Sequence, residues 1–219
     1  MFRRRLPLPP PRHLPWPLKP LQSAQTSLSY DDFGRMVMRI RHDVLKGLTP
    51  GMLVWWFSNI GGEMEVEGQR LNRYLVWHPN DHIRWELARP GPDGRASVGA
   101  KFRIVEAFGR NPEHYIDVTE TVTRLDVSGF AIEGHRLGLQ VTRLNHDFSA
   151  VDGGTLYVSS LTVGTSAPII RNAPQSAPPS HDLSGNEGTR MAQTQCRGGR
   201  TAGTHHPAHL SRCARRRVR

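Results

Sequence analysis

The sequence predicts an α+β fold in which a curved antiparallel sheet packs with one short helix. Between residues 30 and 164, short segments alternate apolar and polar side chains with a period of two, and clusters of Gly, Asn, Asp and Pro separate them. One segment, "LTPGMLVWWFSN", instead carries a helix start signal. Strands that follow one another through short connections indicate an antiparallel meander. We expect this meander to curve enough to enclose a cavity.

The expected elements follow one another along residues 36–164. The first strand is "MVMRIRHDV" (36–44), and in the next segment Thr49 can cap a short helix that has Pro50 at its first position. The later strands are "RLNRYLVWH", "HIRWELA", "VGAKFRIVEAF", "HYIDVTETVTRLDV", "GFAIEG", "RLGLQVTRLNHDF" and "GGTLYVSSLTVG". One short helix before six or more strands is the profile of a helix-grip fold of the Bet v 1-like or START-like kind. That fold normally ends in a long C-terminal helix, which we expect to be missing here.

The composition divides the chain into three parts. Residues 1–28 form an arm rich in Pro and Arg, which favours extended, disordered conformations. Residues 29–164 form the patterned domain. Residues 165–219 contain no Phe, Tyr or Trp, so they cannot bury enough apolar surface to offset their ordering entropy. We expect a disordered basic tail there, either regulatory or the product of translation out of frame.

Charge, cysteine content and hydropathy limit the classes of partner and the cellular compartment that we expect. The net charge of +10 would suggest nucleic acid, but the excess lies in the two ends, and the domain carries no nucleic-acid-binding motif. The two cysteines, Cys196 and Cys213, lie in the tail, which fits a reducing cytoplasm. No apolar run is long enough to span a membrane, and the prolines of the arm interrupt any secretory signal. A monomer and a homo-oligomer both stay open.

The segment "WHPNDH" (77–82) is the first candidate site. Pro79 suits the second position of a type I turn, so His78 would end one strand and His82 would begin the next. Two imidazoles around a turn suggest a metal site, but this spacing lacks the helical register that makes similar motifs specific. Two solvated turn residues are an equally good interpretation.

A carboxylate and several ring-bearing side chains are the other candidates. Glu106 shares a strand face with Phe102 and Ile104, where a carboxylate is costly unless it is paired or binds a metal. The alternative is an error in the strand register. His146 and Tyr157 on adjacent strands could be ordinary sheet residues. Four tryptophans are either plain core or the wall of a pocket for a flat ligand: Trp55, Trp56, Trp77 and Trp85.

Five segments together resemble the 2,4-diacetylphloroglucinol hydrolase family, which includes phloretin hydrolase-like enzymes. They are "TPGMLVWWFSN", "RYLVWHPNDH", "VGAKFRIVEAFG", "RLNHDF" and "GGTLYVSSLTVG", and the resemblance covers residues 30–164. It implies a Bet v 1-like fold and a zinc-dependent hydrolase. Such an enzyme cleaves the carbon–carbon bond between an acyl group and a polyhydroxylated aromatic ring, so the implied substrate is a polyphenolic ketone.

The resemblance also implies roles for individual residues. His78 matches a zinc ligand, and Glu106 matches the carboxylate ligand of the following strand. His146 and Tyr157 resemble residues that bind the phenolic oxygens of the ring. Asp81 lies where a further polar contact with the ring is expected.

Two more residues are expected to contact the substrate, Tyr74 and Trp77. The family takes its remaining zinc ligands from a His-x-x-x-Glu pair on the C-terminal helix. In this chain His181 and Glu187 have the wrong spacing for that pair.

Two function classes therefore remain open. One is a zinc-dependent hydrolase acting on aryl ketones, with an incomplete zinc site in this chain. The other is a non-catalytic START-like pocket for an aromatic or lipid-like ligand. The zinc content of the purified protein would separate them.

Overall fold

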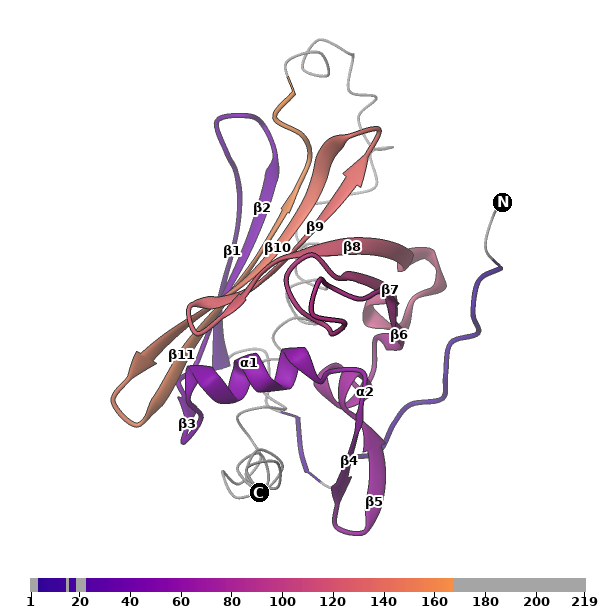
Figure 1. Ribbon diagram of the computed structural model, residues 1–219, viewed down its shortest axis with the longest axis vertical. Helices are drawn as coiled ribbons and strands as arrows, with labels where there is room; N and C mark the ends of the chain where they lie inside the picture. Colours follow the sequence, from indigo (N-terminus) through magenta and orange to yellow (C-terminus); the bar gives the residue numbers. More distant parts are fainter. Residues whose placement is uncertain (1–3, 15, 19–22, 168–219) are drawn as a thin grey trace.

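The computed structural model describes residues 4–14, 16–18 and 23–167. In this part of the chain, eight strands form the main sheet (Figure 1). Their order is β1-β2-β11-β10-β9-β8-β7-β6, and a short β3 pairs with β11. The strands are β1 (Ala24–Tyr30), β2 (Met36–His42), β3 (Leu45–Lys46), β6 (His82–Arg89), β7 (Lys101–Ala107), β8 (Tyr115–Asp126), β9 (Gly129–Arg136), β10 (Leu139–Val151) and β11 (Gly154–Val163). Every pairing is antiparallel, and from β6 to β11 each strand pairs with the next one along the chain.

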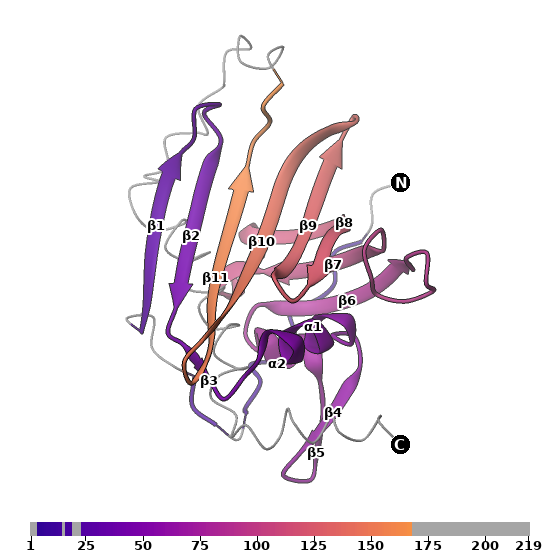
Figure 2. The ribbon, with the colours of Figure 1, turned by 60° about the vertical axis from the view of Figure 1, so that its left-hand side comes forward.

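Two helices lie close together at one end of the curved sheet in both ribbon views (Figures 1 and 2). Helix α1 (Pro50–Ser58) contacts β8, β9 and β10, and helix α2 (Arg73–Trp77) contacts β6. Between the helices, a hairpin of β4 (Glu63–Val66) and β5 (Gln69–Asn72) projects away from the sheet. Two 3-10 turns, Phe108–Arg110 and Pro112–His114, connect β7 to β8. The chain therefore has the predicted α+β helix-grip fold.

The predicted start of α1 is confirmed. The side chain of Thr49 accepts a hydrogen bond from the backbone N of Met52 at 3.3 Å, and Pro50 occupies the first turn, where no N–H is needed. Leu53, Trp56 and Phe57 form the buried face of the helix, at the spacing expected for one side of a helix.

An aromatic core fixes α1 to the sheet. The ring of Phe57 stacks on Phe130 with ring centroids 4.6 Å apart, and it lies 6.0 Å from the ring of Phe148. Trp56 and Trp77 bring the two helices together, with ring centroids 5.7 Å apart. The core is therefore concentrated between the helices and the concave face of the sheet.

The prediction of a strand over residues 70–78 is wrong beyond Asn72. The side chain of Asn72 accepts a hydrogen bond from the backbone N of Leu75 at 3.3 Å and caps helix α2. The apolar run "RYLVW" is too short for its periodicity to distinguish strand from helix. As a result, His78 ends a helix and not a strand, and the 78–82 segment is a helix-to-strand corner and not a hairpin tip.

The described part of the arm contacts the domain. Arg5 and Leu6 reach the β7–β8 connection, where the backbone N of Leu6 donates to the hydroxyl of Tyr115 at 3.0 Å. Strand β1 begins at Ala24, within the segment that the sequence assigns to the arm. The division of the chain into three parts stays a prediction. The predicted disordered tail and missing C-terminal helix, with His181 and Glu187, lie outside the described residues beyond residue 167. Within the described residues, every helix is too short or too polar to cross a bilayer.

Candidate functional site

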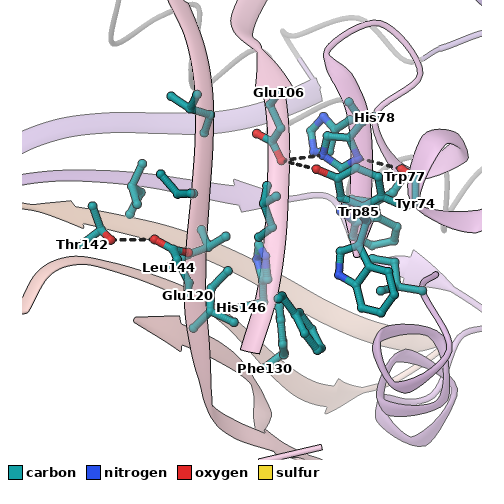
Figure 3. A pocket seen from close by; sticks show the side chains of 18 of the residues that line it. Tyr74, Trp77, His78, Trp85, Glu106, Glu120, Phe130, Thr142, Leu144 and His146 are labelled. Carbon is teal, nitrogen blue, oxygen red and sulfur yellow. Dashed lines mark hydrogen bonds and ion pairs between the residues drawn. The ribbon is translucent and has the colours of Figure 1, made fainter. Parts of the chain in front are cut away.

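A cavity of about 270 Å³ lies between the two helices and the concave face of the sheet (Figure 3). Most of its wall is apolar, and α1, α2, four strands and one 3-10 turn supply these ring-bearing side chains: Phe57, Tyr74, Trp77, Trp85, Phe102, Phe108, Phe130 and His146. The predicted enclosure of a cavity by the meander is confirmed. Of the four tryptophans, Trp77 and Trp85 line the cavity, whereas Trp56 is core.

His82, Glu106 and Tyr74 form a polar cluster at one end of the cavity. Nε2 of His82 lies 3.1 Å from Oε1 of Glu106, and the Tyr74 hydroxyl donates to the same oxygen at 2.8 Å. Nδ1 of His82 lies 2.6 Å from the backbone oxygen of Tyr74, which can only accept, so Nδ1 carries a hydrogen. A hydrogen bond between Nε2 and Oε1 then requires one further proton, on the imidazole or on the carboxyl group, and a metal ion between the two atoms is the alternative. Burial and the charge of Glu106 raise the pKa of the Tyr74 hydroxyl well above its usual value, so this hydroxyl stays a donor.

His78 lies beside this cluster. It follows the last residue of α2 and lines the cavity, and its ring centroid is 4.6 Å from that of His82. His78 and Glu106 thus line the same cavity although 28 positions separate them in the sequence. The imidazole that contacts Glu106, however, is that of His82. Because both rings are buried, the interpretation of two solvated turn residues is wrong.

The backbone explains why Glu106 faces the cavity. Glu106 pairs with His82 across β6 and β7, and Phe102, Ile104 and Phe108 line the cavity with it, as the alternation predicts. A register error is therefore excluded. The Arg103 guanidinium on the opposite face forms a bidentate ion pair with Asp117 at 2.8 and 2.7 Å, which anchors β7 to β8 from outside.

A second group of polar side chains surrounds His146. Its Nδ1 lies 2.8 Å from the Tyr157 hydroxyl and 3.0 Å from the Ser159 hydroxyl, and Nε2 of His42 lies 3.5 Å from that same Ser159 oxygen. Burial, with the nearby charges of His42 and Arg124, lowers the pKa of His146 to about 3. The ring is therefore neutral at pH 7. When one of the two hydroxyls donates to Nδ1, the hydrogen of the neutral ring lies on Nε2.

Not all the predicted site residues reach the cavity. Tyr74, Trp77, His78, Glu106 and His146 line it. Asp81 and Tyr157 are buried but lie outside its lining.

These two residues act on the site through neighbours. The backbone oxygen of Asp81 accepts a hydrogen bond from the backbone N of Ala107 at 2.9 Å, which fixes the 78–82 corner to the end of β7. Tyr157 contacts the ring of His146 and holds its Nδ1.

One charged residue of the cavity, Glu120 on β8, was not predicted from the sequence. The Thr142 hydroxyl donates to Oε1 of Glu120 at 2.6 Å, and both residues line the cavity (Figure 3). Burial raises the pKa of Glu120, the Thr142 hydrogen bond opposes part of this rise, and the charge of Glu106 adds to it. The alternation of Ile116, Val118 and Glu120 carries the same signal that identified Glu106, so the sequence could have revealed it.

The side chains around His82 show how far the described residues fit a zinc ion. His82 has the arrangement of a metal-binding imidazole, because Nδ1 donates to a backbone oxygen and Nε2 faces a carboxylate. Catalytic zinc usually has three protein ligands. Across the described residues, no three His, Cys, Asp or Glu side chains are arranged to hold a metal ion. Two ligands therefore converge in this part of the chain, and they do not make a complete zinc site.

The arm contacts the corner that carries the histidines. Nη1 of Arg12 donates to the backbone oxygens of Pro79 and His82, at 2.7 and 2.9 Å. Nη2 of Arg110 donates to the backbone oxygen of Pro9 at 2.7 Å. The backbone oxygens at both ends of the 79–82 segment are thus held by one guanidinium.

No protein-family model matches the sequence, and neither does any curated protein. Solved structures with a similar fold include a START superfamily protein from Mycobacterium smegmatis. It is 12% identical, the match covers 62% of this chain and 80% of that chain, and the TM-score is 0.43. A major latex-like protein from Panax ginseng is 10% identical over 78% of this chain and 96% of that chain, with a TM-score of 0.48. These likenesses are weak and say nothing about the ligand of this chain.

Proposed function

We propose that this chain binds a small, flat aromatic ketone that carries hydroxyl groups, within the cavity of its sheet. The observation that carries the proposal is an apolar, largely aromatic cavity with a few converging polar side chains, which is the usual composition of a small-molecule site. The polar groups lie at separate positions around the wall: His82 with Glu106, His146, and Glu120 with Thr142. A lipid-like ligand has its polar groups at one end, so this distribution favours a ring with several polar substituents.

The direct test is a binding measurement with 2,4,6-trihydroxyacetophenone by isothermal titration calorimetry. In the Leu144→Trp variant the larger side chain occupies the cavity, and we expect binding to disappear. Leu139→Trp is the matched control, because Leu139 lies on the same strand and does not line the cavity. Equal binding by the two variants, or no binding by the original chain, would refute the proposal.

Hydrolysis of the bound ketone is the second candidate function, and the contact between His82 and Glu106 favours it. Water attacks the acyl carbonyl carbon, and the bond to the ring breaks with its electron pair on the ring carbon, which takes up a proton. Glu106 can accept the proton of the attacking water, and the neutral His146 can donate Nε2–H to a phenolic oxygen of the leaving ring. The resemblance adds zinc to this proposal, with His78 and Glu106 as its predicted ligands. Since the described residues do not complete a zinc site, no step is assigned to the metal.

Product analysis separates binding from hydrolysis. Incubation of 2,4,6-trihydroxyacetophenone with the chain should yield acetate and phloroglucinol if the chain is a hydrolase, and Glu106→Gln should stop their formation. Elemental analysis of the purified protein tests the zinc proposal separately. Binding without either product would leave the chain a non-catalytic binder.

A further inference from the structure

Glu120 is a buried carboxyl group in the wall of an apolar cavity. The residue is 8% exposed, and its one hydrogen bond among the described residues comes from Thr142 to Oε1. In the same part of the chain, no Lys, Arg or His forms an ion pair with it. Its second oxygen, Oε2, has no donor from the described residues. A carboxyl group so placed is costly unless another donor reaches it.

A glycine on the neighbouring strand leaves space for this carboxyl group. Gly134 on β9 pairs directly with Thr142 on β10, and Glu120 comes from β8 on the other side. A Cβ on Gly134 would lie 2.9 Å from Oε1 of Glu120 and would collide with the hydroxyl of Thr142. The side chains of Glu120 and Thr142 therefore pack over Gly134, which has no side chain to displace them.

The position of Glu120 is opposite that of the His82 cluster. Glu106 pairs with Ile116, whereas Phe102 pairs with Glu120, so four positions along the strands separate the two carboxylates. At about 3.3 Å for each residue this is roughly 13 Å along the sheet. Figure 3 shows Glu120 with Thr142 on one side of the cavity and Glu106 with Tyr74 and His78 on another. A single ring with a carbonyl substituent and a hydroxyl group opposite to it has a comparable length, once a hydrogen bond at each end is included.

We propose that Glu120 and Thr142 form a subsite that binds a hydroxyl group of the ligand, at the end of the cavity opposite His82 and Glu106. A hydroxyl group can donate to Oε2 of Glu120, and it remains neutral in the apolar cavity. A ligand without a donor at this position would exclude water from the carboxyl group and leave Oε2 without a hydrogen-bond partner. This subsite rests on the proposed function, since it assigns one contact of the same aromatic ligand.

The test compares two probes that differ by one hydroxyl group. Calorimetry with 2,4,6-trihydroxyacetophenone and with 2,6-dihydroxyacetophenone should show roughly tenfold tighter binding of the first, the usual value of one hydrogen bond to a buried group. In Glu120→Ala this preference should disappear, and in Thr142→Val it should weaken. Glu65→Ala is the control, because Glu65 is exposed on β4, outside the cavity, and should keep the full preference.

The possible outcomes separate this inference from the proposed function. Equal binding of both probes to the original chain would overturn the subsite and leave the ligand class standing. No binding of either probe would overturn both. A preference that survives in Glu120→Ala would also overturn the subsite. The comparison on the original chain needs no variant, and Glu120→Met, which has a similar length and no acceptor oxygen, replaces Glu120→Ala if that variant fails to fold.

Discussion

His82 and Glu106 face each other across the first pair of β6 and β7, with Nε2 of the imidazole 3.1 Å from Oε1 of the carboxylate. Two buried groups, the imidazole of His82 and the Tyr74 hydroxyl, thus meet at one oxygen. The pair connects the helix-to-strand corner to β7, the second strand from this edge of the sheet. Its loss should therefore affect stability as well as ligand binding.

Glu106→Ala should lower the free energy of unfolding by roughly 1 to 3 kcal/mol, because it removes the acceptor of the buried Tyr74 hydroxyl and the partner of the buried His82 imidazole. Urea denaturation followed by circular dichroism measures this change. Glu113→Ala is the control: Glu113 is exposed, and the variant should stay within about 0.5 kcal/mol of the original. If both variants have the same stability, the contact between His82 and Glu106 contributes nothing.

His146 should make stability depend on pH. Its pKa is lowered from 6.5 to about 3 in the folded state, so the unfolded state binds more protons between these values. Stability should therefore fall as the pH falls through this range, by roughly 1.4 kcal/mol for each pH unit from this group alone.

Denaturation midpoints between pH 6.5 and 4.5 test this dependence. The variant His146→Gln should lose this part of the slope. His135→Gln should keep it, because His135 lies on the exposed end of β9. A slope that is the same in both variants would assign the acid sensitivity to other groups.

Arg12→Gln should loosen the 79–82 segment with little effect on global stability. The guanidinium donates to the backbone oxygens of Pro79 and His82, and a glutamine side chain is too short to reach both. Amide hydrogen exchange should become faster at Asn80 and His82 and stay unchanged in β9 to β11. Arg4→Gln, at an exposed residue of the same arm, is the control. Unchanged exchange at the corner would show that the arm does not position it.

Gly134→Ala should be destabilising, although alanine is tolerated in most strands. The new Cβ would collide with the hydroxyl of Thr142 and press on Glu120. Adding Thr142→Ala in the same chain should recover part of the loss, because it removes the closest atom. Gly51→Ala on α1 is the control, since the nearest atom there is 3.8 Å away and the residue lies in a helix. Additive effects of Gly134→Ala and Thr142→Ala would contradict the close contact.

Much of the sheet could be predicted because alternation identifies strands buried on one face. The segments around Phe102, Phe130 and Tyr157 are strands in the structure as predicted. The segment after Asn72 was predicted wrongly because five residues are too few to show a helical period, and the capping by the Asn72 side chain depends on local geometry.

The site was less predictable than the fold. Alternation correctly placed Glu106 in the cavity, and it marks Glu120 equally well. The sequence could not show which of His78 and His82 contacts Glu106, because both histidines flank the same predicted turn. Only the register of β6 against β7 brings His82 to Glu106. The contact between the Tyr157 hydroxyl and Nδ1 of His146 depends on the pairing of β10 with β11, which the sequence does not specify.

A crystal structure of the chain with 2,4,6-trihydroxyacetophenone tests the central claim most directly. We predict that the ligand lies inside the cavity between Trp77 and Phe130, with one hydroxyl group within hydrogen-bond distance of Glu120. Its carbonyl group should face the end that holds His82 and Glu106. A ligand bound on the outer face of the sheet, or a cavity that stays empty at saturating ligand, would show that the cavity is not the binding site.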